Sequence, residues 1–551
     1  MRQRFGPYDL PLALFLISAV TGILPAYDRS LSMTALVALL GGGLLYTAIS
    51  RLASTRARWD AAALGLAAVT VLVSGYYVTQ LGHMGFEEKI APLARAAAGI
   101  ARFTPDLAYW KPLGNTIGTF LEGGLFLLVG LALVTHRPVP RALLLAGLGF
   151  TILALLFSAS RGAWLAVLAA GLLWAALYLK PARWLIIAAA VGLAMLALYA
   201  LVRGDIRVLG DIPGVGAVLG PLFVRPDRLE VYYNSLALIR DVPFTGIGLG
   251  GQFAMAYSRY ELLLHVPFLY YAHNLFLEIW LEQGLLGIFA WVWLVTTVFT
   301  TAWGWRGTDR SDTRIRFEST WIGLTAVLIH ALSDARQAQA LLSWLPFFTL
   351  LGLNAALVLH GQVQTQPHNR WVRYLPAGAG AACLLLGLVS AWPLPASIHA
   401  NQAALIQQRA DLASQVDQRE GDALLDQSAG LFKEALNTDP DNRTANQRLG
   451  LIALSRQEFD PAVQFLSAAH TKDPRHPGTR RALGLAYAFT GRLAEALPLL
   501  RDQLNIVDEL NYWGWYYSTH DQPLAGLNAM RMSLLLQPNQ PDIQQYVDQS
   551  R

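Results

Sequence analysis

Runs of mostly apolar residues, separated by short polar breaks, recur along the first 392 residues of the chain. A helix that crosses the hydrocarbon core of a bilayer needs about 20 consecutive apolar residues, which is the typical length of these runs. The pattern therefore predicts an all-α, polytopic membrane bundle of about eleven spans. The expected spans lie near residues 10–26, 32–50, 60–80, 113–134, 142–158, 163–179, 184–203, 276–303, 318–333, 340–359 and 375–392.

The pattern changes after residue 392, because residues 393–551 hold dense charge and no comparable apolar run. Such a stretch is typical of a soluble domain. We therefore expect a membrane domain over residues 1–392 and a soluble helical domain over residues 393–551.

The C-terminal part repeats itself at a spacing of 34 residues. This period, with a Leu-Gly pair, a small residue on the second helix and a closing proline, is typical of tetratricopeptide repeats. Stacked repeats form an α-solenoid with a concave surface for a protein partner or for self-association. A generic helical bundle is the alternative. Asp439-Pro440 recurs as Asp473-Pro474, Leu449-Gly450 as Leu483-Gly484, and Ala462 as Ala496, and a looser third copy runs from Gly514 to Pro538.

Composition agrees with the membrane assignment. The 551 residues are 54% hydrophobic and 14% charged, with a mean hydropathy of +0.38, whereas soluble domains carry roughly a quarter charged residues. The single cysteine, Cys383, lies in an apolar run, so no intrachain disulfide can form.

The arginine-rich loops fall on one side of the predicted bundle, and the positive-inside rule makes that side cytoplasmic. With the N-terminus inside, an odd number of spans places the C-terminal domain and a long loop over residues 204–275 outside. Single arginines in the outer loops are not explained by this rule, so we expect an anionic ligand there. The arginine-rich loops are residues 1–4, 51–58, 135–141, 179–184, 304–316 and 368–373.

Two outer arginines stand out. Arg161 lies in the turn SASRG between two spans, and Arg228 begins an amphipathic stretch, RLEVYYNSLALIRD. The planar guanidinium suits phosphate oxygens, and several such groups in a partly dehydrated cleft would bind a diphosphate strongly. The alternative for each is anchoring at lipid headgroups.

His273 and Asn274 open a long apolar helix that runs to about residue 303. This helix, about 46 Å long, exceeds the hydrocarbon thickness, so we expect His273, Glu278 and Glu282 to project into the outer interface. Its N-terminus favours an anion, and a neutral imidazole there could take a proton from an attacking hydroxyl. The alternative is a simple helix cap, for which Asn274 is suited.

Other polar positions have both a structural and a functional interpretation. The GIGLGG loop at residues 246–251 satisfies G-x-G-x-x-G formally, but it lacks the strand context of a dinucleotide site and is a tight loop that is either structural or lines a substrate path. His330 and Asp334 share a helix face, as an orienting pair or a polar contact between spans. Glu122 is a mid-span acid without a basic partner at comparable depth. Zinc ligation by the histidines at 265, 273 and 330 lacks metal-like spacing.

In order along the chain, three motifs resemble the Wzy_C superfamily of O-antigen ligases, Wzy-type polymerases and PglL-type O-oligosaccharyltransferases. The motifs are SASRGAWLA (158–166), RLEVYYNSLALIRDVPFTGIGLGGQF (228–253) and HNLFLEIWLEQGLLGI (273–288). The resemblance implies a C-type glycosyltransferase-like fold in the cytoplasmic (inner) membrane. Such enzymes transfer a glycan from undecaprenyl diphosphate to an acceptor hydroxyl on the outer face.

The resemblance also implies site residues. Arg161 and Arg228 would clamp the diphosphate, and His273 would activate the acceptor hydroxyl or assist the leaving diphosphate. The partners would be a lipid-linked glycan donor, membrane lipid, and a lipid, glycan or protein acceptor, with no metal, cofactor or nucleic acid. The further substrate-binding candidates, drawn from the motifs or their surroundings, are Arg336, Arg240, Asn274, Glu282, Gly246 and Gly248.

A different class of protein is the rival. A lipid-linked glycan transporter would show paired charges near the middle of the bilayer and inverted repeats, and an assembly scaffold would need no arginines at the outer turns. Within the resembling families, a Wzy-type polymerase or a protein O-oligosaccharyltransferase remains the alternative to a ligase.

Overall fold

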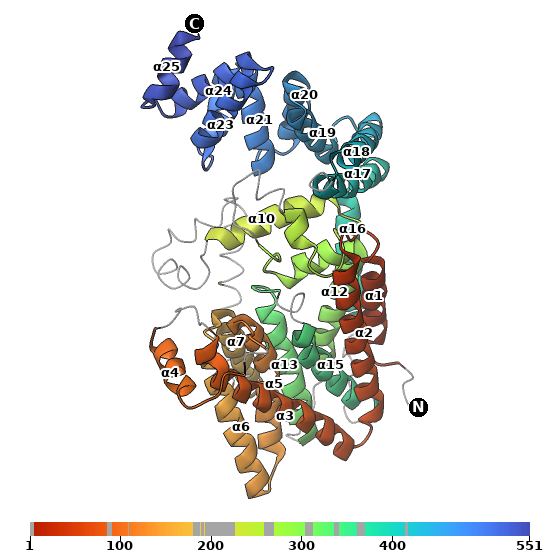
Figure 1. Ribbon diagram of the computed structural model, residues 1–551. Helices are drawn as coiled ribbons and strands as arrows, with labels where there is room; N and C mark the ends of the chain where they lie inside the picture. Colours follow the sequence, from red (N-terminus) through yellow and green to blue (C-terminus); the bar gives the residue numbers. More distant parts are fainter. Residues whose placement is uncertain are drawn as a thin grey trace.

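The computed structural model describes residues 5–84, 91–107, 110–179, 226–257, 269–303, 312–335, 341–360, 370–413 and 417–550, together with residues 184, 188 and 192. Within these residues every regular element is a helix, as the sequence predicted. Figure 1 shows one group of helices built from the first 390 residues and a second group from the C-terminal part, with α10 (Pro226–Asp241) between them.

The described helices of the first group are mostly long and apolar. A short 3-10 turn follows α3 at Leu81–His83, and another precedes α15 at Leu341–Ser343. The helices are α1 (Asp9–Thr21), α2 (Arg29–Leu52), α3 (Arg56–Gln80), α4 (Ala91–Ala101), α5 (Gly114–Val134), α6 (Pro138–Phe157), α7 (Arg161–Tyr178), α12 (Leu275–Trp303), α13 (Asp312–His330), α15 (Trp344–Leu359) and α16 (Arg370–Ser390).

Among the described residues, six helices are long and apolar enough to cross a membrane, or up to seven if a bent pair counts as one span. The bent pair joins part of α16 to α17 (Leu394–Ala413) at 86°. Two expected spans are shorter helices, α1 with 13 residues and α15 with 16. The expected span near 184–203 lies almost wholly outside the described residues. The chain is a multi-pass membrane protein, and its described residues hold fewer clear spans than the eleven expected for the whole chain.

The expected span near residues 318–333 belongs to α13, which lies in the core of the bundle. Its side chains from Arg316 to Leu328 are buried. The charges of its first turns are paired, because Arg314 Nε lies 2.7 Å from Glu318 Oε1 and Arg316 Nε lies 2.9 Å from Asp60 Oδ1. Other helices therefore surround α13 and shield it from lipid.

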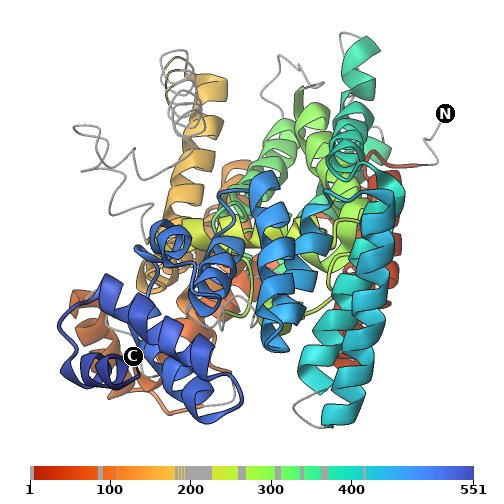
Figure 2. The ribbon, with the colours of Figure 1, turned by 90° about the horizontal axis from the view of Figure 1, so that it is seen from above.

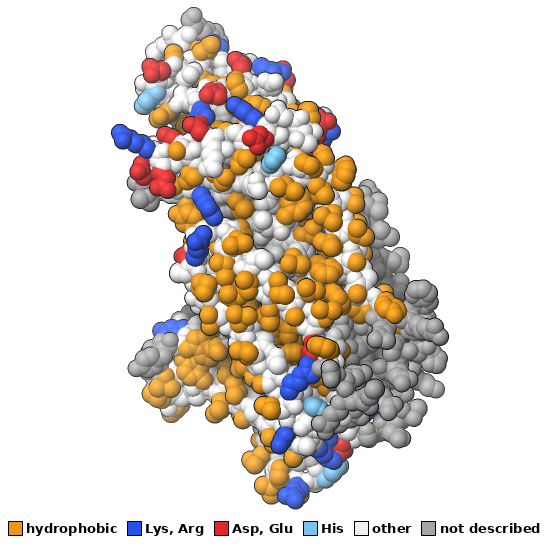
Figure 3. Space-filling model, turned by 90° about the vertical axis from the view of Figure 1, so that its right-hand side faces the viewer, with side chains coloured by type: hydrophobic (Ala, Val, Ile, Leu, Met, Phe, Trp, Pro, Cys, Tyr) orange, Lys and Arg blue, Asp and Glu red, His pale blue; other side chains and the backbone are white. Residues whose placement is uncertain are grey.

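The outer helices present apolar side chains outward. Val37 and Leu44 on α2 are 64% and 72% exposed, and Leu386 on α16 is 71% exposed. On the face that Figure 3 shows, hydrophobic side chains cover the middle of the molecule and charged side chains gather toward its two ends. This surface suits contact with lipid tails, for which burial within the protein is not required.

The described parts of three arginine-rich loops, at 51–58, 135–141 and 304–316, meet at one end of the bundle. Arg51 lies 2.5 Å from Asp9, at the start of α1, and Arg56 Nη2 lies 2.6 Å from Asp312 Oδ2, at the start of α13. His136, after α5, also faces Asp312. The clustering agrees with the one-sided charge pattern in the sequence, and the opposite end holds the starts of α5, α7 and α12.

The second group consists of paired helices that arch over one end of the bundle (Figures 1 and 2). The predicted boundary at residue 392 falls between α16 and α17. The helices are α17 (Leu394–Ala413), α18 (Gln418–Thr438), α19 (Arg443–Ser455), α20 (Phe459–Lys472), α21 (Pro477–Phe489), α22 (Leu493–Leu500), α23 (Ile506–Thr519), α24 (Pro523–Leu536) and α25 (Pro541–Gln549).

The repeated glycines have a common packing role in these pairs. A Cβ atom on Gly450, Gly484 or Gly514 would lie 2.5–2.7 Å from Leu466, Leu500 or Met530, respectively. Each partner lies 16 residues after its glycine, on the second helix of the pair. The first helix therefore needs glycine where the second helix comes closest, which accounts for the register seen in the sequence. The tetratricopeptide classification itself stays a prediction.

His476 caps the start of α21. Its Nδ1 accepts a hydrogen bond from the backbone N–H of Thr479 at 3.1 Å, and the side chain is buried. Burial, together with the nearby positive charge of Arg443, lowers the pKa of His476 to about 4. Protonation of Nδ1 would also destroy the cap, since a protonated nitrogen cannot accept a hydrogen bond.

We expect His476 to make the C-terminal helices acid-sensitive. The pKa is lower in the folded state than the roughly 6.5 of a free histidine, so the unfolded chain binds the proton more readily and stability falls as pH drops from about 6.5 toward about 4, by up to roughly 3 kcal/mol. His476→Asn keeps a capping oxygen and removes the titration. The thermal unfolding midpoint of the detergent-purified chain is expected to fall more between pH 7 and pH 5 in wild type than in this variant. Equal falls would contradict the assignment.

Candidate active site

Among the described helices, three N-termini and one C-terminus meet at the end of the bundle that faces α10. The helices α5, α7 and α12 begin there at Gly114, Arg161 and Leu275, and α13 ends there at His330. The backbone N–H of Leu275 donates to the carbonyl of Ala331 at 2.8 Å, which ties α12 to the end of α13. Helix N-termini carry partial positive charge and unsatisfied N–H groups, so this end of the bundle favours an anion.

The SASRG turn places Arg161 at the first position of α7. Ala159 has a left-handed backbone (φ +49°), and the hydroxyl of Ser160 accepts from the N–H of Ala163 at 3.4 Å. A Cβ atom on Gly162 would lie 2.8 Å from the ring of His330. Glycine is therefore required for α7 to pack against the end of α13, and the exposed Arg161 is held beside that contact.

His273 lies immediately before α12 in a left-handed backbone conformation (φ +54°). Its carbonyl accepts a hydrogen bond from the hydroxyl of Tyr232 on α10 at 2.9 Å. Its Nδ1 lies 3.9 Å from Oδ1 of Asp334, and its ring packs on Tyr271 with centroids 4.3 Å apart. The side chain is 18% exposed, so the protein orients the imidazole and leaves part of it accessible.

Asn274 is the cap of α12, as one reading of the sequence proposed. Its Oδ1 accepts from the N–H groups of Phe276 and Leu277 at 3.0 and 3.2 Å. Its Nδ2 donates to the carbonyl of Leu332 at 2.9 Å. Asn274 thereby joins the start of α12 to the residues after α13, and a contact with substrate stays a prediction.

Asp334 connects His273 to α5. Its carboxylate is 2% exposed and accepts from Nδ2 of Asn115 and from the N–H of Ala335. These contacts direct Oδ1 toward the imidazole of His273. Sequence reasoning grouped Asp334 with His330 and missed Asn115, whose only signal was its place at the start of an apolar run.

His330 turns toward the middle of α5 instead. Its Nδ1 lies 3.1 Å from Oε2 of Glu122 and 3.3 Å from the hydroxyl of Thr119, and both ionisable side chains are fully or almost fully buried. The expectation that Glu122 lacks a basic partner at its depth is therefore wrong. The two helices α5 and α13 supply these partners, which lie 208 residues apart in sequence.

The two carboxylates of α12, which we expected to project into the outer interface, are buried within the protein instead. Glu278 is 1% exposed and accepts from the N–H of Ala272 at 2.7 Å. Glu282 is 6% exposed and accepts from the N–H groups of Gly250 and Gly251 at 2.9 and 3.4 Å. Both side chains bind backbone of the loops that precede α12, and a role of Glu282 in substrate binding stays a prediction.

The glycine loop docks where α12 is interrupted. Gly284 has φ +64°, which breaks the helical hydrogen-bond pattern. The loop supplies hydrogen-bond partners to the backbone groups freed by this break. Ile247 N–H donates to the carbonyl of Leu281 at 2.6 Å, and Leu285 N–H donates to the carbonyl of Phe244 at 3.3 Å.

Gly246 and Gly248 have close neighbours on both sides of this loop. A Cβ atom on Gly246 would lie 2.2 Å from the carbonyl oxygen of Leu281, and one on Gly248, at φ +114°, would lie 2.4 Å from Cα of Ala26. The loop is therefore structural, as one of its two readings held, and substrate contact by these glycines stays a prediction.

The structure describes only some of the remaining candidate residues. Arg240 Nη1 lies 3.1 Å from Oδ2 of Asp473 in the C-terminal part. The side chain of Arg228 and the whole of Arg336 lie outside the described residues, as does His265. Over the described part of the chain, no group of three or more His, Cys, Asp and Glu side chains is arranged to hold a metal ion.

Comparison with known protein families finds a match for the middle of the chain. Residues 146–292 match the family model Wzy_C, described as O-antigen ligase. This segment contains Arg161, Arg228 and His273, whereas Asn115 and Asp334 lie outside it. No curated protein matches the chain significantly. The chain thus carries, over residues 146–292, the Wzy_C domain of O-antigen ligase- and polymerase-type membrane enzymes.

Proposed function

We propose that the protein is an O-antigen ligase-like glycosyltransferase that moves a glycan from undecaprenyl diphosphate to an acceptor hydroxyl on the outer face of the cytoplasmic membrane. The observation that carries the proposal is that the helix starts bearing Arg161 and His273 lie at one end of the bundle, where Asp334, just after the end of α13, lies 3.9 Å from Nδ1 of His273. The Wzy_C match and the one-sided arginine-rich loops support the chemistry and the orientation, respectively.

The diphosphate of the donor binds at the helix N-termini, at headgroup depth, while the lipid tail stays in the bilayer. Arg161 supplies a charged, planar group for phosphate oxygens. Arg228, Arg336 and Arg240 stay candidates for the same role. Because negative charge grows on the leaving diphosphate, fixed positive groups stabilise the transition state more than the bound donor.

In the transfer step, the acceptor oxygen forms a bond with the anomeric carbon of the glycan. The bond between that carbon and the diphosphate oxygen breaks, and the diphosphate keeps the electron pair. The acceptor proton passes to the imidazole of His273. Asp334, 3.9 Å from Nδ1, orients the ring and balances the charge that it gains.

A lipid-linked glycan transporter is a second candidate with one observation in its favour. The buried Glu122–His330 pair is the kind of mid-bundle charge pair that a transporter would use. The pair lies about two helical turns beyond Asn115 along α5. It leaves Arg161 and His273 without a role, so transfer accounts for more of the site.

The test is product formation by the reconstituted chain. Proteoliposomes receive an undecaprenyl-diphosphate-linked glycan and, separately, a lipid-core, glycan or peptide acceptor. Transfer predicts free undecaprenyl diphosphate only when the correct acceptor is present, and the acceptor that responds identifies a ligase, a polymerase or a protein glycosylating enzyme. Movement of the intact donor between leaflets without free undecaprenyl diphosphate would support the transporter and contradict transfer.

A further inference from the structure

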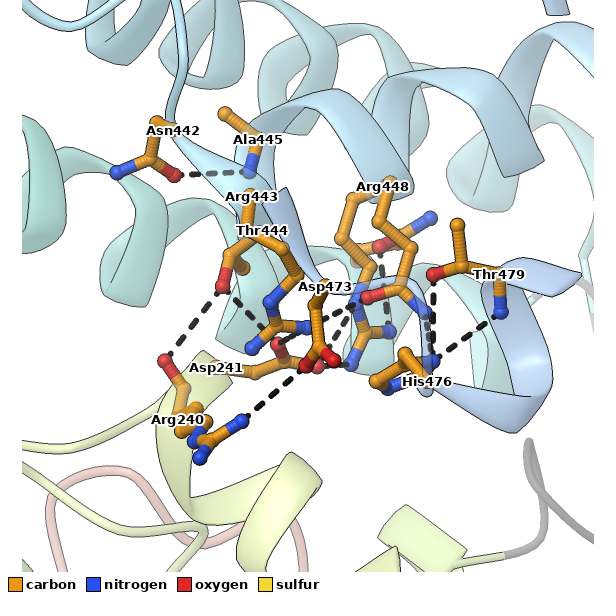
Figure 4. A network of polar contacts seen from close by, with 12 residues as sticks. Arg240, Asp241, Asn442, Arg443, Thr444, Ala445, Arg448, Asp473, His476 and Thr479 are labelled. Carbon is orange, nitrogen blue, oxygen red and sulfur yellow. Dashed lines mark hydrogen bonds and ion pairs between the residues drawn. The ribbon is translucent and has the colours of Figure 1, made fainter. Parts of the chain in front are cut away.

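A buried ion-pair cluster joins the end of α10 to the C-terminal helices. We call Asp241, Arg443, Thr444 and Arg448 the Asp241 cluster. The carboxylate of Asp241 is fully buried, lies 2.9 Å from Nη1 of Arg443 and accepts from Nε of Arg448 and the hydroxyl of Thr444, each at 3.1 Å. Figure 4 shows these side chains reaching from α19 to the last residue of α10.

The charges of this cluster hold one another in place. Burial alone would raise the pKa of Asp241, but Arg448 and Arg443 outweigh burial and hold that pKa well below its usual range. Charges that are removed from water need paired, hydrogen-bonded partners, and the loss of one partner leaves the others uncompensated. The Asp241 cluster therefore fixes one geometry between α10 and α19.

Further contacts extend this junction. Arg240 pairs with Asp473, and Asn401 on α17 bonds to both the N–H of Phe244 and the hydroxyl of Thr245 in the loop after α10. Apolar side chains of α10, α17, α18 and α19 share one core. The C-terminal helices therefore hold α10 and the start of the glycine loop as one body.

The same helix reaches the candidate active site. Tyr232 lies nine residues before Asp241, which is about 14 Å along a helix. The hydroxyl of Tyr232 donates to the carbonyl oxygen of His273 at 2.9 Å and lies 3.4 Å from the carbonyl oxygen of Leu332. The motion of α10 would therefore move the backbone support of His273.

We propose that Asp241 is a positioning residue through which the C-terminal helices hold α10, and with it Tyr232, in the orientation that supports His273. The proposal rests on the proposed function insofar as it concerns transfer, but the positioning itself is a property of the fold. The C-terminal helices then support the candidate active site through α10.

Hydrogen exchange on the detergent-purified full chain tests the positioning without any substrate. We expect Asp241→Asn to speed exchange over residues 226–241 and also over 269–275, and Tyr232→Phe to speed it over 269–275. The matched control is Asp426→Asn, which breaks the exposed Asp426–Arg456 pair on the same helical group and is expected to change neither segment. Unchanged exchange over 269–275 in Asp241→Asn would overturn the proposal.

Thr444→Val serves if Asp241→Asn does not fold, because it removes one hydrogen bond to Asp241 and no charge. We expect exchange to become faster over the same segments, 226–241 and 269–275, but by less than in Asp241→Asn. A change confined to α19, with residues 269–275 at the wild-type level, would again overturn the positioning role.

Transfer assays give the second readout. A small misplacement of a reacting group costs about a hundredfold in rate, so Asp241→Asn and Tyr232→Phe are each expected to lower transfer by about tenfold to a hundredfold. Because both act through His273, the double variant is expected to lose little more than the worse single variant. Fully multiplied losses would overturn the proposal. Absence of transfer in wild type would count against the proposed function alone, since hydrogen exchange still decides the positioning.

Discussion

Replacement of Arg161 by alanine is expected to abolish glycan transfer, with a loss of at least about a hundredfold, while the protein still inserts and folds. The loss follows from the position of Arg161 at the start of α7, where three helix N-termini meet. A fixed positive group that faces a leaving diphosphate acts mainly in the transition state, and the removal of one such group costs about 10²–10³ in rate. The fold tolerates the change because the side chain is exposed.

Two further variants make this result specific. Arg161→Lys keeps the charge but loses the planar fork, so it is expected to retain part of the activity. Arg141→Ala removes an exposed arginine from the first turn of α6, near the opposite end of the bundle, and is expected to leave transfer unchanged. Transfer is followed as free undecaprenyl diphosphate, and folding as the thermal unfolding midpoint. Full activity of Arg161→Ala would remove Arg161 from the diphosphate site.

The sequence predicted the helical bundle well because spans are long and the apolar signal is local. Six or seven of the described helices are long and apolar enough to cross a membrane, α1 and α15 are shorter, and the expected span near 184–203 lies almost wholly outside the described residues. The sequence predicted a span near residues 318–333, and the helix found there, α13, is a core helix whose early arginines pair with Asp60 and Glu318. A run of apolar residues reports burial but does not say whether lipid or protein surrounds the helix.

The candidate site was predicted in part for a similar reason. The SASRG and HN motifs pointed to Arg161 and His273, because a guanidinium suits phosphate oxygens and an imidazole can take a proton whatever the fold. Asn115 and Asp334 could not be paired from sequence, since 219 residues separate them. The loop amides of Gly250 and Gly251 that Glu282 binds could not be foreseen from sequence either. Long-range partners of this kind depend on the fold.

Replacement of His273 by asparagine is expected to lower transfer by at least about a hundredfold, because the general base is lost. Asparagine tolerates the left-handed backbone at this position better than most residues, so the contact between its carbonyl and Tyr232 is kept while the imidazole is removed. The control, His136→Asn, changes a histidine that is 80% exposed at the opposite end and is expected to transfer normally. A loss smaller than about tenfold would make His273 a positioning residue rather than a base.

The same mechanism gives Asp334 a role that can be distinguished by experiment from a purely structural one. If His273 takes the proton, its ring becomes positive 3.9 Å from a carboxylate that Asn115 and the Ala335 N–H hold in place. Asp334→Asn then lowers transfer only while His273 is present, because its charge acts on the protonated ring. The double variant Asp334→Asn/His273→Asn is therefore expected to be no slower than His273→Asn alone. Independent, multiplied losses would show that Asp334 acts on something other than the imidazole.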